Sequence, residues 1–314
     1  MKQAFLPRIS GPYAFENLSV FLLHGEDRVA KGSYRALQQA MESKTTTVHE
    51  TGNVGELLIE NLGDLDVFIQ AGDILKGGRQ DRVIGVDFIL SKRSGRVPIP
   101  SFCVEQGRWH RRGSESEMVF ASSASYLSSK SVKLGAKVSA SQADVWSSVA
   151  KEQQKLSAAV HGSVAAEESD SSYQLTLEHQ KVQDRIKSCV ETLRKDALGY
   201  EDTVGFVFAI GDELNSADLY VNHDLFIQLW DKLLNAAATE AVAESHHPKQ
   251  PAKAKLTTKD VEEFLETQDM AGQEPRLVTP RVQLRQYGNG KRFRFETEDM
   301  EQKATCVHAN VMSH

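Results

Sequence analysis

The sequence predicts an α+β protein, with an antiparallel β-sandwich or barrel-like N-terminal half and packed helices in the C-terminal half. Three observations lead to this prediction. Short apolar or alternating segments, separated by glycine turns, fill residues 1–121 without a long helical pattern between them. Apolar residues at helical spacing then dominate residues 141–198 and 223–244. A glycine-centred hairpin pattern follows near the end of the chain, around Asn289.

The first half is expected to consist mainly of short strands. We expect one short helix at 32–42, and strands at 15–24, 45–49, 56–60, 66–70, 83–90, 96–104 and 118–121. Residues 61–64 are expected to join two of these strands as a hairpin. Pro98 and Pro100 favour a sheet edge or a bulge, because proline has no N–H group for a ladder hydrogen bond. The serine-rich run 122–131 is expected to be a surface loop.

The second half is expected to alternate helices with a few strands. We expect helices at 141–160, 173–198, 223–244 and 257–268, and strands at 203–210, 217–221, 282–286, 292–296 and 305–311. Asn222, and Thr257 together with Asp260, are placed to cap helices, and Gly199 to end one. His179 falls on an apolar helical stripe, where a satisfied core histidine is expected.

These patterns predict four parts of the chain. Residues 1–121 form a β-rich domain, and 122–244 form a helical segment with a β-hairpin, packed on the first part as one unit. Residues 245–256 form a linker, and 257–314 a short helix with a C-terminal β-hairpin. Such a division fits a chain of 314 residues, which is long enough for one large domain or two ordinary ones.

Composition limits the classes of function. Hydrophobic residues make up 40% and charged residues 25%, as in soluble globular proteins. The net charge of −6 argues against general nucleic-acid binding. We expect a soluble, cytoplasmic protein without a membrane association, since no signal peptide or long apolar run is found. The three separated cysteines and scattered histidines predict no disulfide framework, no metal site and no cofactor.

A basic region interrupts this acidic chain. Residues 76–112 hold nine Lys or Arg and three acids, a net charge of +6, so the rest of the chain carries −12. The first part of the region reads Lys76, Gly77, Gly78, Arg79, Gln80, Asp81, Arg82. Two glycines leave backbone amides uncovered, and with the flanking cations they form a candidate cradle for a phosphate or carboxylate. The alternative is a glycine turn whose charges are solvated or paired with Asp81 and Asp87.

A second polar cluster follows the strand at 96–104. Arg108, Trp109 and His110 are candidate ligand-binding residues, since they offer fork-like hydrogen bonds, stacking and charge. Cys103 is a candidate nucleophile if a neighbouring cation lowers its pKa, and Glu105 is a candidate general base. The alternative is that Cys103 is a small buried hydrophobic residue and that Glu105 simply pairs with Arg108.

Four segments resemble an uncharacterised prokaryotic family, the ARG-and-rhodanese-phosphatase-associated proteins. They are GDILKGGRQDRVIGVDFIL, VPIPSFCVEQGRW, the helix around Trp146, and VGFVFAIGDELNSADLYVNHDLFIQLWDKLL. Together they span roughly Phe15 to Ala241, whereas the segment after Thr257 looks less typical. The resemblance implies no catalytic residues.

Two functions are compatible with these residues. The preferred one is a non-enzymatic binding or assembly module, whose arginine-rich loops bind an anionic ligand, an acidic patch on a partner protein, or another copy of the chain. The alternative is a small hydrolase or transferase acting on a phosphorylated or nucleotide substrate through Cys103 or Glu105. Both require the diglycine turn and the Cys103–Trp109 segment to lie together.

Overall fold

The computed structural model describes residues 7–245 and 256–314, without the side chains of 123–125 and 197. The described chain divides into two compact units, each built from separate stretches of sequence. The first unit contains residues 7–33, 191–230 and 256–314, and the second contains 34–190 and 231–245. The two ends of the described chain therefore belong to the same unit.

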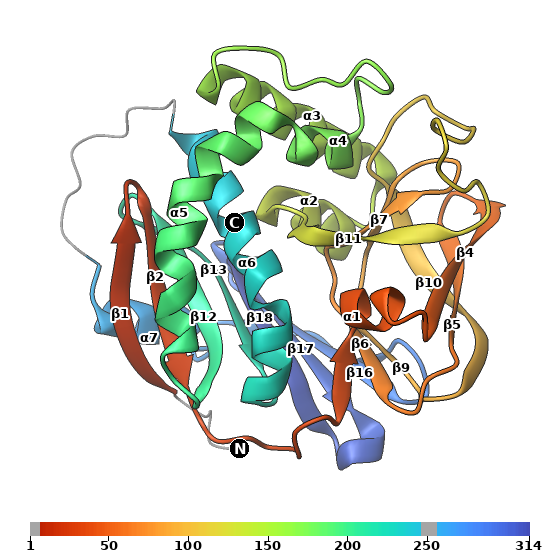
Figure 1. Cartoon of the computed structure of the whole chain (residues 1–314). Helices are drawn as coiled ribbons and strands as arrows, with labels where there is room; N and C mark the ends of the chain where they lie inside the picture. Colours follow the sequence, from red (N-terminus) through yellow and green to blue (C-terminus); the bar gives the residue numbers. More distant parts are fainter. Residues whose placement is uncertain (1–6, 246–255) are drawn as a thin grey trace. The chain divides into compact units, whose positions relative to one another are not determined.

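A nine-stranded sheet forms the first unit (Figure 1). Its strands are β1 (Arg8–Phe15), β2 (Leu18–His24), β12 (Thr203–Ile210), β13 (Glu213–Tyr220), β18 (Thr305–Ser313), β17 (Arg292–Asp299), β16 (Val282–Gly288) and β14 (Ala271–Gly272), in this order, with β15 (Arg276–Leu277) also paired to β16. Neighbouring strands are antiparallel. The apolar strand β12 lies between β2 and β13 and is buried along its whole length.

Helix α7 (Thr258–Leu265) packs against this sheet. Its Val261 and Phe264 share a buried cluster with Phe21 and Val207 from the strands. At the N-terminus of α7, the predicted capping box is present between Thr257 and Asp260. The amphipathic sequence of this short helix thus covers part of the sheet that would otherwise face water.

The second unit contains a six-stranded antiparallel sheet and a smaller three-stranded one. The larger sheet has the order β11 (Phe120–Leu127), β7 (Asp73–Gly77), β8 (Arg82–Ile84), β10 (Ser94–Cys103), β5 (Glu56–Asn61), β4 (Thr46–Asn53). His49 of β4 forms a bridge with Val119, just before β11, and the amide of Glu50 donates to Met118 O at 3.0 Å. These contacts bring the two outer strands together and nearly close the sheet into a barrel.

The remaining elements of the second unit cover this barrel-like sheet. The small sheet consists of β3 (Tyr34–Ala36), β6 (Asp66–Ile69) and β9 (Phe88–Leu90), and the helices are α1 (Leu37–Glu42), α2 (Lys130–Leu134), a π-helical turn at Gly135–Ser139, α3 (Gln142–Ala159) and α4 (Tyr173–Glu178). Ile74 and Val83 of the sheet pack against Val145 and Val149 of α3 and Tyr173 of α4. Two longer helices, α5 (Gln180–Leu198) and α6 (His223–Glu244), each contribute residues to both units.

The α+β class and the large antiparallel sheets are confirmed, but the division into a β-rich N-terminal half and a helical C-terminal half is not. The nine-stranded sheet combines strands from the beginning, the middle and the end of the chain. The β16–β17 hairpin of this sheet was predicted correctly, and so was the helix at 223–244. Asn222 caps that helix as expected, accepting a hydrogen bond from the amide of Leu225 at 2.9 Å.

Several strand predictions are wrong because turns interrupt the apolar runs. Segment 15–24 is two strands, broken at Glu16, which has a positive φ. Segment 83–90 is split between β8 and β9, which belong to different sheets. The expected hairpin at 61–64 does not exist, since β5 pairs with β4 and β10, and β6 pairs with β3 and β9. Asn61 instead fixes a local turn, because its side chain bonds to Gly63 N and Leu65 O.

Two helix boundaries and one loop also differ from the prediction. Residues 34–36 of the expected helix 32–42 form β3, because they pair with β6. The expected helix 173–198 breaks at His179, whose extended backbone ends α4, so this histidine is not on a core stripe. The serine-rich run is no loop but the end of β11 and the start of α2. Pro98 and Pro100 lie where β10 pairs with β5, while the pairing with β8 begins at Ser101.

The expected linker 245–256 lies almost entirely outside the described residues. Within the part that the structure does describe, none of the helices combines the length and apolarity needed to cross a bilayer.

Candidate functional site

The diglycine turn and the Cys103–Trp109 segment lie together, as both functional hypotheses required. Arg108 Nη1 donates to Gly78 O at 3.1 Å, and Gln80 Nε2 donates to Glu105 O at 2.9 Å. The amide of Asp81 donates to Glu105 Oε2 at 3.0 Å. The two sequence clusters therefore form one contiguous site in the second unit.

Backbone geometry at the end of β7 creates this arrangement. Gly77 and Gly78 have φ angles of +113° and +56°, which glycine adopts without strain. A Cβ atom at Gly78 would lie 2.3 Å from Phe120 Cζ, so the turn can pass close to β11 only because position 78 has no side chain. Strand β8 then begins at Arg82, which pairs directly with Cys103 of β10.

Two buried carboxylates, Glu105 and Asp81, bind Arg108 and Arg112. Glu105 accepts hydrogen bonds from Arg108 Nε at 2.7 Å and from Arg108 Nη2 at 2.6 Å. Asp81 accepts from Arg112 Nη1 at 2.9 Å and from Ser172 Oγ at 2.8 Å. Burial alone would raise the pKa of Glu105, but the hydrogen bonds from Arg108, Ser169 and the amide of Asp81 outweigh it and lower the pKa.

The outer cations are also paired. Lys76 Nζ lies 2.6 Å from Glu178 Oε2, and Arg79 Nε lies 3.4 Å from Glu117 Oε1. Arg112 Nη2 contacts Glu115 Oε1 at 3.0 Å, and Arg111 and His110 are exposed at the surface. The positive charge counted between residues 76 and 112 is thus largely neutralised by acids from outside that stretch.

Arg82 differs from these arginines because its guanidinium group is incompletely paired. Its side chain is fully buried, and Nη1 donates to Cys103 Sγ at 2.8 Å. The nearest carboxylate is Glu50, whose Oε2 lies 3.6 Å from Nη2. Among the residues that the structure describes, neither Nε nor Nη2 of Arg82 has a hydrogen-bond partner. A buried cation in this state costs free energy, so the arrangement requires an explanation.

Trp109 lies beside this buried group and remains 40% exposed. The guanidinium carbon of Arg82 lies 5.7 Å from the centroid of its ring, and that of Arg79 lies 5.6 Å from it. These distances are typical of cation–π contacts. The indole therefore separates Arg82 from solvent while its outer part stays accessible.

Cys103 is buried and its thiol is not activated. Burial raises its pKa to about 11, although the positive charge of Arg82 acts in the opposite direction. The thiol is therefore protonated near neutral pH, whereas thiolate is the nucleophilic form.

The acidic residues Asp218 and Asp224 do not converge on one point. Asp218 is buried and binds His308 and Asn310, while Asp224 accepts from the amide of Gly32 and from Gln228. No group of three or more metal-binding side chains is found among the described residues.

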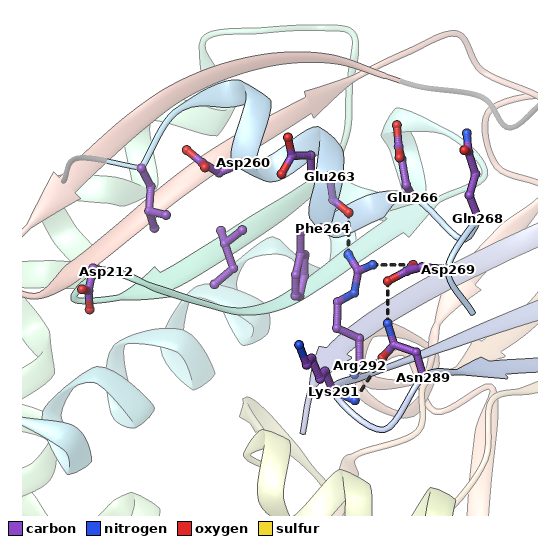
Figure 2. A pocket seen from close by; sticks show the side chains of 12 residues that line it. Asp212, Asp260, Glu263, Phe264, Glu266, Gln268, Asp269, Asn289, Lys291 and Arg292 are labelled. Atoms are coloured by element: carbon purple, nitrogen blue, oxygen red, sulfur yellow. Dashed lines mark hydrogen bonds and ion pairs between the residues drawn. The ribbon is translucent and has the colours of Figure 1, made fainter. Parts of the chain in front are cut away.

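The first unit carries a groove that the sequence did not indicate (Figure 2). It is open, has a volume of about 730 Å³, and is bordered by α7, the turn at Asp212 and the β16–β17 hairpin. Asp260, Glu263 and Glu266 line it, and Arg292 crosses it to bind Asp269 Oδ1 at 2.7 Å. Periodicity could not find this groove, because its residues come from three distant segments.

Residues of the Arg82 site were also missed by sequence reasoning. Three of them make hydrogen bonds within the site: Glu50 accepts from the amide of Arg79, Glu115 accepts from Arg112, and Ser172 donates to Asp81. They lie outside the two clusters and follow no motif. Arg112 was noted only as part of the charge count. Nothing in the sequence around Arg112 indicated that it would bind Asp81, which lies 31 residues earlier.

Comparisons with known proteins place the whole chain in one family. No curated protein and no solved structure matches it. A family model does match, over residues 7–314, which is nearly the full length and includes the segment after Thr257. The chain belongs to the family of the ARG and Rhodanese-Phosphatase-superfamily-associated Protein domain.

Proposed function

We propose that the second unit is a binding module for an anionic group, with Arg82 as the residue that recognises it. The observation that carries this proposal is the fully buried guanidinium with two nitrogens that lack hydrogen-bond partners in the described part of the chain. Nε and Nη2 lie on the same edge of the guanidinium plane, and this edge matches two oxygens of a carboxylate or phosphate.

Glu50 does not occupy that edge itself. Its Oε1 accepts from the amides of Thr51 and Gly52, at 3.0 and 2.9 Å, and its Oε2 accepts from the amide of Arg79 at 3.2 Å. These bonds hold the carboxylate at 3.6 Å from Arg82 Nη2, which is longer than a hydrogen bond. Glu50 thus compensates part of the positive charge and leaves the hydrogen-bonding edge unused.

Trp109 and Arg79 stand at the entrance in this proposal. A ligand reaches Arg82 when the exposed indole moves aside, and Arg79 then supplies a second, partly exposed cation. Gly77, Gly78, Gln80 and Arg108 shape the turn beneath, through hydrogen bonds that they already make. Lys76 and His110 remain candidate contacts at the rim. The proposed site is therefore narrower than the basic region expected from the sequence.

Substitution of Arg82 by lysine tests the proposal, because lysine keeps the charge and removes the planar fork. With inorganic phosphate or citrate at constant ionic strength, the melting temperature of the wild type should rise with ligand concentration. The rise should be absent in Arg82→Lys and retained in Arg93→Lys, which changes an exposed arginine paired with Asp64. An equal rise in both variants would contradict the proposal.

Trp109 provides a second readout if the Arg82 variant is poorly folded. Because its ring contacts Arg82, ligand binding should change the quenching of Trp109 fluorescence by acrylamide. The difference between wild type and Trp109→Phe isolates this signal from Trp146 and Trp230. Unchanged quenching at saturating phosphate and citrate would also count against the site.

The chemistry at this site favours binding over reaction. The raised pKa of Cys103 leaves a neutral thiol, and both oxygens of Glu105 are occupied by Arg108. Neither residue therefore supports the hydrolase or transferase alternative.

The proposal also includes a cytoplasmic location, a homo-oligomer and an acidic patch on a partner protein as the ligand. Light scattering on the purified protein measures the oligomeric state directly.

A further inference from the structure

Ser10, His24 and Asp202 form a hydrogen-bonded chain in the first unit. Ser10 Oγ lies 2.7 Å from His24 Nε2, and His24 Nδ1 lies 2.8 Å from Asp202 Oδ1. The three residues come from β1, from the end of β2 and from the turn before β12. This is the order of contacts found in serine hydrolases, where a histidine bridges a serine and a carboxylate.

The protonation states follow from the partners. Asp202 can only accept a hydrogen bond, because the hydrogen bonds from His24 and Arg8 outweigh desolvation and lower its pKa. His24 Nδ1 therefore carries the proton and donates it. In the neutral imidazole, Nε2 is then the acceptor and receives the Ser10 hydroxyl proton. This tautomer is the one in which histidine acts as a general base towards serine.

The surrounding contacts fix the geometry. The side chain of His24 is 1% exposed, and its ring packs edge-on against Tyr200 at 4.9 Å. Arg8 Nη2 holds the other oxygen of Asp202 at 2.8 Å, and the amide of Gly25 donates to Asp202 O at 2.9 Å. Ser10 is only partly buried, and it precedes Gly11, whose φ is +106° at an irregularity in the β1–β2 pairing. His24 is thus held by hydrogen bonds at both ring nitrogens, and Ser10 is partly exposed.

We propose that Ser10 is a nucleophile for carboxylic esters, with His24 as its general base and Asp202 as the residue that positions His24. Ser10 Oγ attacks the carbonyl carbon while its proton moves to His24 Nε2, and a tetrahedral intermediate forms. His24 returns the proton to the leaving alcohol as the ester C–O bond breaks, which leaves Ser10 acylated. Water, deprotonated by His24, then hydrolyses this acyl ester and restores the hydroxyl group.

Tyr13 is the neighbouring donor for the negative charge that develops on the carbonyl oxygen. Its hydroxyl lies 3.4 Å from Ser10 Oγ and 2.9 Å from the hydroxyl of Tyr200. Such a donor stabilises an oxyanion more than the neutral carbonyl of the substrate. The two tyrosines also flank Ser10 with aromatic surface, which suits an aryl or short acyl ester. This activity lies beyond the anion binding proposed for Arg82 and does not depend on it.

Covalent labelling tests the nucleophile in the full-length protein. A fluorophosphonate probe should label the wild type on the peptide that contains Ser10, as identified by mass spectrometry. Labelling should be lost in Ser10→Ala and kept in Ser33→Ala, whose hydroxyl donates to Ala30 O. Labelling that persists in Ser10→Ala, or no labelling of the wild type, would overturn the proposal.

Hydrolysis of p-nitrophenyl acetate separates the roles of the partners. Asp202→Asn keeps the size of the side chain and changes the tautomer that it favours, so kcat/KM should fall about tenfold or more. The pH profile of kcat/KM should differ between the wild type and Asp202→Asn, and Ser10→Ala should flatten it. Circular dichroism verifies that the variants are folded. Equal rates and equal pH profiles in the wild type and Ser10→Ala would refute the assignment.

Discussion

Glu152 is a buried carboxyl group that lies near two others. Its side chain comes from α3, and Oε1 has no hydrogen-bond partner in the described part of the chain. Its pKa is raised to about 8: burial is the largest cause, the nearby Glu240 and Glu244 of α6 also raise the pKa, and Lys155 opposes them. The folded protein therefore holds the proton more tightly than the unfolded chain, in which the pKa is near 4.5. Stability from this group is present at low pH and is lost as the pH rises to about 8.

Replacement by glutamine should remove this pH dependence. Between about pH 5 and pH 8, the group lowers the free energy of unfolding of the wild type by up to about 1.4 kcal/mol per pH unit. Glu152→Gln should thus be more stable than the wild type at about pH 8, with a smaller difference at about pH 5. Urea unfolding followed by circular dichroism measures both. The exposed Glu262→Gln serves as the control, and a pH-independent difference would contradict the assignment.

Arg112 shows why the basic region was only partly predictable. Its guanidinium contacts Asp81 at 2.9 Å and Glu115 at 3.0 Å, and Ser172 joins the same group through Asp81. A charge count over neighbouring residues includes Arg112 but leaves out partners brought in by the fold. Sequence spacing did locate the diglycine turn and the Cys103–Trp109 segment. The spacing of residues in the sequence did not indicate which charged side chains of the region 76–112 would be buried and paired.

At the scale of single elements, the turn after β7 depends on a residue without a side chain. In Gly78→Ala, the new Cβ would lie 2.3 Å from Phe120 Cζ and 2.9 Å from Glu50 Oε2, at a φ of +56°. We expect a loss of about 1–3 kcal/mol in the free energy of unfolding. Gly95→Ala is the matched control, since nothing lies within 4 Å of its Cβ and its φ is not positive. Equal losses in urea unfolding would show that the turn is not constrained in this way.

The capping box of α7 gives a second prediction for an element. Thr257 Oγ1 accepts from the amide of Asp260, and Asp260 Oδ2 accepts from the amide of Thr257 at 2.7 Å. Thr257→Ala should lower the free energy of unfolding by about 1 kcal/mol. The adjacent Thr258→Ala, inside the helix, should have a smaller effect. The reverse order of the two effects, in thermal or urea unfolding, would contradict the role of the cap.

The capping box was predictable because its residues are three positions apart, within the range of a local pattern. The failures at the hairpin 61–64 and at strand 83–90 have a different cause. A turn was expected at 61–64, but the strands on either side of it pair with other strands, and the break at Gly85–Asp87 places β8 and β9 in different sheets. The Ser10–His24–Asp202 chain was likewise hidden, because Asp202 is 178 residues from His24. Periodicity reports local structure and not the pairing of distant strands.

At the scale of the whole molecule, both units combine separate stretches of the chain. In the first unit, β18 lies between β13 and β17, with Val307, Val311 and Met312 buried. Truncation after residue 304 removes this strand and should prevent the nine-stranded sheet from forming. We expect insoluble protein, or a loss of cooperative unfolding in calorimetry. Removal of His314 alone is the control and should leave the unfolding transition intact.

The position of β18 has a consequence for biosynthesis. Strand β18 is synthesised after both of its neighbours, yet both need it to complete their hydrogen bonds. During translation, β13 and the β16–β17 hairpin therefore present open edges, which are prone to pair with other chains. These edges stay open until β18 has been synthesised, so chaperones that bind nascent chains should strongly affect the yield of folded protein.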